Sequence, residues 1–229
     1  MSNDSPENSE EVITWRQRLY DQLLSGNRPA AVYLANMLAD TSYPLAFIYT
    51  GLFRPVLYAF GDECAQGRLS SAIIHVAGSM VHTMLAVLYH RRVAGIELVK
   101  PSVIISCVPG NLHEIGPRMV ADLLEEARYR TIYLAPPVER SALLELIFKQ
   151  RPAAIALSTS MTSQLPDLTM LVDLLRNGGY RGKIVADGRA LSLTAFSRVT
   201  PGIDWSGSDP VELISWLDHH MTKTEQDGG

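Results

Sequence analysis

The feature that most constrains the fold is a change of sequence rhythm near residue 100. Beyond it, short runs rich in β-branched residues alternate with stretches whose apolar residues recur at helical spacing. The strands expected from these runs are 102–108, 131–134, 153–158, 183–186 and 203–205. The helices expected between and after them are about 117–129, 138–149, 166–177 and 209–221. The alternation predicts an α/β domain, a doubly wound parallel five-stranded sheet of the flavodoxin or Rossmann type.

The first part of the chain, from residue 11 to about residue 89, is helical in pattern throughout, with Gly and Pro between the helical stretches. An apolar stripe that includes Trp15 and Leu19 stops at Gly26. The later helices are expected at about 29–39, at 42–67 with a bend at Pro55, and from residue 70 onward. Short connections between four such helices favour an antiparallel four-helix bundle.

These patterns define the expected domains. The polar segments at the two ends lack the apolar content to order themselves. The expected order is a disordered tail at 1–10, the helical bundle at 11–92, a linker at 93–100, the Rossmann-like domain at 101–222 and a second disordered tail at 223–229.

Composition excludes several classes of function. The chain has 229 residues, of which 47% are hydrophobic and 19% charged, so it can bury a sizeable core. The formal net charge is −4, and no basic run is longer than Arg91-Arg92. A protein that binds nucleic acid directly shows a basic patch or stripe. We therefore expect no direct nucleic-acid partner.

The cysteines and the apolar runs predict the compartment. Cys64 and Cys107 show no CxxC spacing and fit a reducing compartment, so we expect a cytoplasmic protein. The polar start of the chain does not resemble a signal peptide. The longest apolar run, 44–60, is interrupted by Arg54 and Pro55 and is short for a bilayer span. We therefore expect no membrane segment.

The loop after the first expected strand carries one imidazole. Its residues are Asn111, Leu112, His113, Glu114, Ile115 and Gly116. A lone loop histidine more often caps a helix or is exposed than binds a ligand. His113, however, lies beyond the carboxyl end of a strand, where ligands bind in open α/β sheets. A neutral imidazole there can bind a metal through one nitrogen while a second group, here Glu114 or Asn111, orients the other.

Two further loops follow parallel strands and are expected at the same sheet edge. The loop after the third strand carries Ser158, Thr159, Ser160 and Thr162. These polar side chains either cap the next helix or contact a ligand, and the residues alone favour neither reading. The loop after the fourth strand carries Asp187, Gly188 and Arg189. Its glycine permits close backbone approach.

Together, these three loops resemble the three-part signature of the cobalamin-binding domain family. The resemblance implies that His113 replaces the benzimidazole of the cofactor as lower axial ligand to cobalt. It also implies that the displaced nucleotide tail runs between sheet and helices, lined by the Ser158 to Thr162 loop and a glycine pair. Asp187 stands where the family has the first of those glycines.

The helical part resembles the cap of the same family, so that the resemblance covers residues 12–221. In the family a Trp in this cap, and a Glu before a His, cover the upper face of the cofactor. The corresponding residues here are Cys64, and Ile74 before His75. We expect these three, with Phe60, to lie on the cofactor side. For His75 a buried histidine that bonds a backbone carbonyl is an equal alternative.

Within the family, Asn111 separates two functions. Methyltransferases of this family typically have an aspartate there that relays protons, and Asn111 cannot titrate. The loop is similar to that of light-responsive cobalamin sensors, including the photocobilins. We therefore expect a cobalamin-binding photoreceptor that uses adenosylcobalamin, with biliverdin as a second chromophore left open. It would have no catalytic residue and would signal to an unidentified effector protein or through a change of homo-oligomer.

Three alternatives remain at this point. The first is a corrinoid methyl carrier of a methyltransferase system. The second is a sensor that binds haem or only a bilin in the same cleft, which Cys64, Ile74 and Asp187 allow. The third is an interaction module without a cofactor, against which His113 and Ser158 argue.

Overall fold

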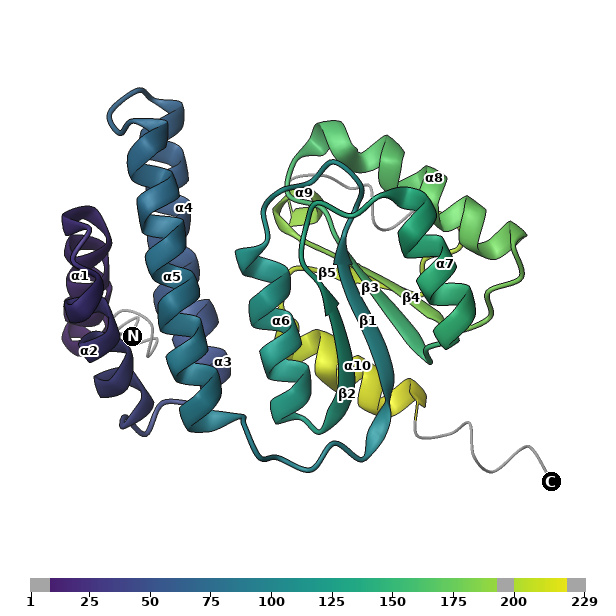
Figure 1. Cartoon of the computed structure of the whole chain (residues 1–229), viewed down its shortest axis with the longest axis horizontal. Helices are drawn as coiled ribbons and strands as arrows, with labels where there is room; N and C mark the ends of the chain where they lie inside the picture. Colours follow the sequence, from purple (N-terminus) through teal and green to yellow (C-terminus); the bar gives the residue numbers. More distant parts are fainter. Residues whose placement is uncertain (1–8, 193–199, 222–229) are drawn as a thin grey trace, which may run out of the picture. The chain divides into compact units, whose positions relative to one another are not determined.

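The structure, a computed structural model, describes residues 9–192 and 200–221 (Figure 1). It contains two compact units, which meet in sequence between Gly95 and Ile96. The first unit is helical. The second holds the sheet, and each is described by itself below.

The helical unit is built from helices whose ends follow from local chemistry. Helix α1 (Glu10–Ser25) starts where the Ser9 side chain accepts a hydrogen bond from the main-chain N of Val12, and it ends at Gly26, which has a φ of 67°. Helix α2 (Arg28–Ala39) starts after Asn27, whose side chain accepts from the main-chain N of Ala30. Such caps satisfy backbone groups that a helix end leaves free. The remaining helices are α3 (Leu45–Phe47), α4 (Arg54–Ala65) and α5 (Ser71–Arg92).

The third expected helix is irregular before Pro55 rather than bent at it. A π-helix, Ile48–Phe53, joins α3 to α4, and Pro55 lies in the first turn of α4, where proline is tolerated. The π-helix requires glycine at position 51, because a Cβ there would come within 2.7 Å of the Phe47 ring. The carbonyl of Gly51 accepts a hydrogen bond of 2.7 Å from Nε of Arg16. A bulge of this kind satisfies its backbone through neighbours rather than through the helix alone.

Helix α5 is the apolar helix of this unit. Among the described residues, it alone has the length and composition that a membrane span requires. It packs against α1, α2 and α4 and places Ala77, Met80, Val81, Met84, Leu85 and Leu88 in the core. A core helix passes the same test, so this finding is weak evidence for a span.

The second unit confirms the expected fold class. Its five strands pair in parallel in the order β2-β1-β3-β4-β5. The strands are β1 (Lys100–Cys107), β2 (Tyr129–Leu134), β3 (Ala154–Ser158), β4 (Lys183–Asp187) and β5 (Trp205–Gly207). The helices are α6 (Ile115–Glu126), α7 (Arg140–Gln150), α8 (Leu165–Asn177), the short α9 (Arg189–Ser192) and α10 (Pro210–Met221). This is the flavodoxin-like strand order of a doubly wound sheet.

Alternating strand residues build a core on each face of this sheet. On one face, Val103 and Ile105 pack with residues of α6 and α10. On the other face, Ile104 and Ile155 pack with residues of α7 and α8. Figure 1 shows the same two layers around the strands. Because side chains alternate across a strand, a sheet buried on both faces needs the continuous apolar runs seen in the sequence.

This topology creates a switch point between β1 and β3. The connection after β1 leads to α6 on one face, and the connection after β3 leads to α8 on the other. The chain therefore diverges between two adjacent strands, and in open α/β sheets ligands bind beyond the carboxyl ends of the strands at such a point. The loops that carry His113 and Ser158 flank that point.

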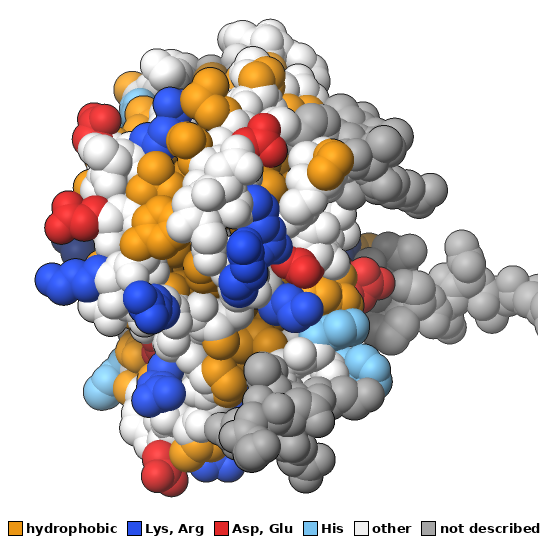
Figure 2. Space-filling view, turned by 90° about the vertical axis from the view of Figure 1, so that its right-hand side faces the viewer, with side chains coloured by type: hydrophobic (Ala, Val, Ile, Leu, Met, Phe, Trp, Pro, Cys, Tyr) orange, Lys and Arg blue, Asp and Glu red, His pale blue; other side chains and the backbone are white. Residues whose placement is uncertain are grey.

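Some apolar surface remains outside both cores. On α7 and α8 the side chains of Phe148, Met170 and Leu174 are exposed. Figure 2 shows hydrophobic side chains between charged ones of both signs on the face that it displays. An open groove of about 750 Å³ beside α8 is lined by Leu165, Met170 and Leu174 among others.

Candidate functional site

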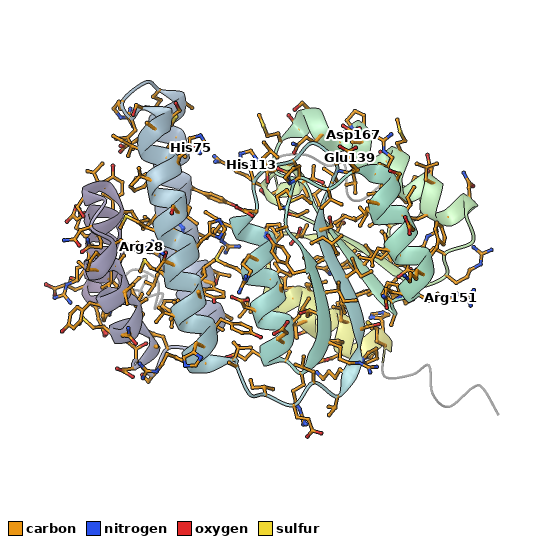
Figure 3. All side chains as sticks on the ribbon, in the orientation of Figure 1. Arg28, His75, His113, Glu139, Arg151 and Asp167 are labelled. Atoms are coloured by element: carbon orange, nitrogen blue, oxygen red, sulfur yellow. The ribbon has the colours of Figure 1, made fainter. Side chains whose placement is uncertain are left out.

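His113 is held by the side chain of Asn111. The amide oxygen Oδ1 of Asn111 lies 3.1 Å from the main-chain N of His113 and 2.9 Å from Nδ1 of its ring. The amide nitrogen Nδ2 donates to the carbonyl of Ser158 at 3.1 Å and to Oγ of Ser160 at 3.3 Å. Asn111 is only 1% exposed, whereas His113 is exposed on the loop after β1 (Figure 3). A buried amide thus joins the β1 loop to the β3 loop.

These contacts determine which nitrogen of the neutral imidazole carries the proton. A main-chain N–H can only donate, so the Asn111 atom that faces His113 must be the oxygen. Nδ1 of His113 must then carry the proton in order to donate to the same oxygen. In the neutral ring the lone pair is left on Nε2, which is the arrangement found in metal-binding histidines. Of the two groups considered from sequence, Asn111 thus orients the ring.

A glutamine that the sequence did not reveal closes the same loop. Oε1 of Gln164 accepts from the main-chain N of Met161, and its Nε2 donates to the carbonyl of Gly110 at 3.5 Å. Gly110 itself has a φ of 86°, a conformation that favours glycine. Nothing in the sequence pattern marks Gln164, because its partners are main-chain atoms.

The loop after β3 supports His113 through Asn111. The carbonyl of Ser158 accepts from Asn111 and also from the main-chain N of Val108, at 3.0 Å. Ser158 is buried, Ser160 is half-buried and Thr162 is exposed at the start of a short 3₁₀ helix. Ser158 and Ser160 thus bond Asn111 rather than cap the next helix. Thr159 is 0% exposed, and its hydroxyl Oγ1 has no hydrogen-bond partner.

The loop after β4 places a carboxyl beside Ser158. Asp187 pairs with Ser158 in the sheet register. Burial raises the pKa of Asp187 to about 6, and a hydrogen bond from Ser158 opposes part of that shift. The other side-chain oxygen, Oδ1, is buried without a partner. Gly188 follows with a φ of 116°, and Arg189 starts helix α9.

The thiol of Cys107 bonds the loop that carries His113. Cys107 is buried at the end of β1, and its Sγ donates to the carbonyl of His113 at 3.7 Å. Burial, with the charges of Asp187 and Glu114, raises the pKa of this thiol to about 12. This burial disfavours the thiolate, which is the form of cysteine that binds metals.

Within residues 9–192 and 200–221, no three His, Cys, Asp or Glu side chains are grouped so that they could hold a metal ion. Among the described residues, the β1 loop therefore offers cobalt or another metal the imidazole of His113 and no protein ligand cluster. A metal that arrives in its own macrocycle fits this donor set, because the macrocycle supplies the equatorial ligands.

Exposed apolar side chains border His113. Leu112 is 67% exposed and Met161, which the sequence did not single out, is 53% exposed. Both lie on loops that Asn111 and Gln164 join. Exposed apolar surface of this kind often marks a ligand site. Ile115 starts α6 with Gly116, and the carbonyl of Glu114 accepts from the Tyr133 hydroxyl at 3.1 Å.

The four expected residues of the helical unit differ in exposure. Phe60 is buried in the bundle core, with its ring centroid 4.7 Å from that of Tyr20. Cys64 and Ile74 are half-buried, and His75 is exposed on α5 (Figure 3). His75 is therefore not the buried histidine that one of the two readings required. The contact of these side chains with a cofactor stays a prediction.

Comparisons with known proteins agree with a site in which one imidazole binds a metal held in a macrocycle. Two family profiles, both described as B12 binding domain, match residues 15–89 and 101–214. The trimethylamine corrinoid protein 1 of Methanosarcina mazei is 25% identical over 199 residues, which are 81% of this chain and 87% of that protein. The trimethylamine corrinoid protein 2 of Methanosarcina acetivorans is 28% identical over 154 residues, 62% of this chain and 65% of that protein.

A solved structure supports the fold. The monomethylamine corrinoid protein of Methanosarcina barkeri superposes with a TM-score of 0.75 at 18% identity, over 87% of this chain and 94% of that one. At this identity the likeness concerns the arrangement of helices and strands alone.

These relatives correct the function expected from the sequence. They are methylamine corrinoid proteins, so the expectation of a photoreceptor with a biliverdin chromophore is wrong. The expectation depended on Asn111, which cannot relay a proton. In the structure the amide oxygen of Asn111 still bonds Nδ1 of His113. The substitution therefore keeps the orienting contact and did not separate the two functions.

Proposed function

Because the chain belongs to the B12-binding domain family, we propose that it is a corrinoid methyl carrier that works with a methyltransferase partner. The observation that supports this most is the Asn111-oriented imidazole, with its free Nε2 at the switch point of the sheet. The relatives named for trimethylamine suggest a methylated amine as the source of the methyl group. This is the first alternative left open by the sequence.

The residues of the chain have separate tasks in this proposal. A bound corrinoid supplies a cobalt that can take up and give away a methyl group. His113 would hold this cobalt through Nε2, and Asn111 holds the ring in position with the proton at Nδ1. Ser158 and Ser160 fix Asn111 in turn. Outer partners of this kind commonly change metal affinity by about 10- to 100-fold.

The upper ligand and the partner follow from the same proposal. Adenosylcobalamin was expected only because a photoreceptor was expected, so we propose that the bound corrinoid would carry a methyl group instead. We assign no catalytic residue, because the partner would activate the methylated amine. The partner that we propose is therefore a methyltransferase, instead of the unidentified effector protein expected from the sequence.

One experiment tests the proposal. Purified protein is mixed with hydroxocobalamin, passed through gel filtration and examined by absorption spectroscopy, alongside His113→Ala and the control His219→Ala. His219 is exposed on α10 and far from the β1 loop in sequence. We expect wild type and control to retain the corrinoid and His113→Ala to lose it.

Methyl loading is then tested on the retained corrinoid. It is reduced with titanium(III) citrate and given isotopically labelled methyl iodide, and the label that remains with the protein is measured. Label that transfers on to a thiol acceptor supports a carrier. Protein that retains no corrinoid, or that changes its oligomeric state only on illumination with adenosylcobalamin, contradicts the proposal.

A further inference from the structure

Two buried polar atoms at the carboxyl edge of the sheet have no hydrogen-bond partner. They are Oγ1 of Thr159 and Oδ1 of Asp187. The third such atom among the described residues, Nε of Arg140, belongs to a side chain that also forms an ion pair with Asp167. An unmade hydrogen bond on a buried group costs about 1–3 kcal/mol. In native proteins most buried polar groups have a partner, which is another protein group, an ordered water, an ion or a ligand.

The backbone holds both side chains in place. Thr159 directly follows β3 and Asp187 is the last residue of β4, and the main-chain N of Thr159 donates to the carbonyl of Asp187 at 2.8 Å. Gly188 lies so close to Thr159 that a Cβ there would be 2.8 Å from its carbonyl carbon. The two strands cannot shift apart or together without breaking this contact. The orphaned atoms are therefore part of a rigid edge.

Among the described residues, the carboxyl of Asp187 forms no ion pair with a cation, and its Oδ1 is buried. The Ser158 side chain bonds one of its oxygens, and burial raises its pKa to about 6. A glycine would fit the same backbone position without burying any charge. The oxygen Oδ1 of Asp187 can therefore accept one further hydrogen bond.

This edge lies on the side of the site from which His113 binds. Ser158 joins the two halves, because its carbonyl accepts from Asn111 and its side chain bonds Asp187. When an imidazole of the protein occupies the lower position of cobalt, the lower base of the corrinoid is displaced. That base and its nucleotide tail must then lie on the His113 side and meet polar groups there.

We propose that Asp187 and Thr159 bind a hydrogen-bond donor on the displaced lower base, and that this chain thereby selects corrinoids whose base carries an amine or a hydroxyl. The inference rests on the proposed corrinoid function. An adenine base carries such an amine, whereas the methyl groups of dimethylbenzimidazole cannot donate. A site that leaves a buried polar group unpaired discriminates against the analogue that lacks the partner.

The test compares three corrinoids by the change of absorption on binding. They are cobalamin, its analogue with an adenine base, and cobinamide, which has no nucleotide tail. Dissociation constants are measured for wild type, Asp187→Gly, Thr159→Val and the matched control Thr169→Val. Thr169 lies on α8 and bonds only within its helix, to the carbonyl of Leu165. Urea unfolding of every variant shows whether it is folded.

We expect wild type to bind the adenine-based corrinoid about tenfold more tightly than cobalamin, the size of one charge-assisted hydrogen bond. Asp187→Gly should abolish this preference and leave cobinamide binding within about twofold of wild type. Thr159→Val should reduce the preference, and Thr169→Val should retain it.

Three results overturn the inference. One is a preference that persists in folded Asp187→Gly. Another is an equal loss of affinity for all three corrinoids, which indicates a structural role. The last is tighter binding of both tailed corrinoids by Asp187→Gly, which indicates that the carboxylate repels the tail. Failure of all three corrinoids, cobinamide included, to bind wild type contradicts the proposed function itself.

Discussion

The two ends of the site differ in how their polar groups are satisfied. Around Asn111, each side-chain atom of the amide has a partner, and the imidazole of His113 is oriented as a result. Around Asp187, one strand further along the sheet, two buried atoms have none. The first end is organised before any ligand arrives. The second, we infer, is completed by a ligand, so the two ends should respond differently to substitution.

The largest expected effect is that of Gly188→Ala at the Asp187 end. Its φ of 116° disfavours any side chain, and the new Cβ would lie 2.9 Å from the main-chain N of Thr159. Strained backbone and overpacking together should lower the free energy of unfolding by about 3 kcal/mol or more. Urea unfolding measures this change. Gly116→Ala is the control, because its Cβ would meet nothing within 4 Å. Equal stability of the two variants contradicts the rigid edge.

Asp187→Asn should change how stability depends on pH. The pKa of Asp187 in the folded protein, about 6, lies above its ordinary value of 3.8. Folding therefore favours the protonated form of Asp187. Its contribution to the free energy of unfolding is present at low pH and is lost as the pH rises through about 6. The loss relative to the asparagine variant should be roughly 2 kcal/mol from about pH 4 to about pH 7.

Urea unfolding of wild type and Asp187→Asn across this range gives the difference directly. Other carboxyl groups titrate equally in both proteins and cancel in the comparison. A difference that stays constant with pH would show that the carboxyl is not buried as described.

At the Asn111 end of the site, Asn111→Ala removes the contact that orients the imidazole but leaves His113 in place. It leaves the carbonyl of Ser158 with one fewer donor and frees the ring of His113. We expect hydroxocobalamin affinity to fall by about 10- to 100-fold. The free energy of unfolding should fall by about 1–3 kcal/mol. Asn177→Ala, at an exposed position on α8, is the control for both measurements. Unchanged affinity in Asn111→Ala would mean that the ring needs no orientation.

The smallest effect is expected for Ser160→Ala. The Ser160 hydroxyl lies 3.3 Å from Nδ2 of Asn111, and the Ser158 carbonyl accepts from the same nitrogen. Its loss should lower the free energy of unfolding by about 0.5 kcal/mol and hydroxocobalamin affinity by less than about threefold. A larger effect than that of Asn111→Ala would show that Ser160 contacts the ligand itself.

Sequence rhythm was sufficient to predict the fold because most elements follow from local pattern. All five strands overlap the predicted ones, and the buried strand β3 agrees within one residue at its start. The π-helix at Ile48–Phe53 could not be predicted. It depends on Gly51 against the Phe47 ring and on Arg16, which is distant in sequence. The short helix α9 gives too few residues for a periodic signal.

The common sheet edge of the predicted site residues could be derived from sequence, but the contacts between them could not. His113 and Ser158 follow strands that the pattern identifies, so their common edge follows from topology. The hydrogen bond between Asn111 and His113 depends on how the loop packs, which the sequence pattern does not show. From sequence, Asn111 was considered only as a residue that cannot titrate. The orphaned oxygens of Thr159 and Asp187 are likewise visible only when neighbouring atoms are placed.

The central claim is that Nε2 of His113 binds the cobalt of a corrinoid. The most direct measurement is the electron paramagnetic resonance spectrum of cobalt(II) cobalamin bound to protein that contains ¹⁵N-labelled histidine. If His113 is the ligand, the nitrogen splitting changes from a triplet in unlabelled protein to a doublet in labelled protein, and it disappears in His113→Ala. A triplet that persists in labelled protein would show that the cofactor's own base remains bound, and would contradict the account.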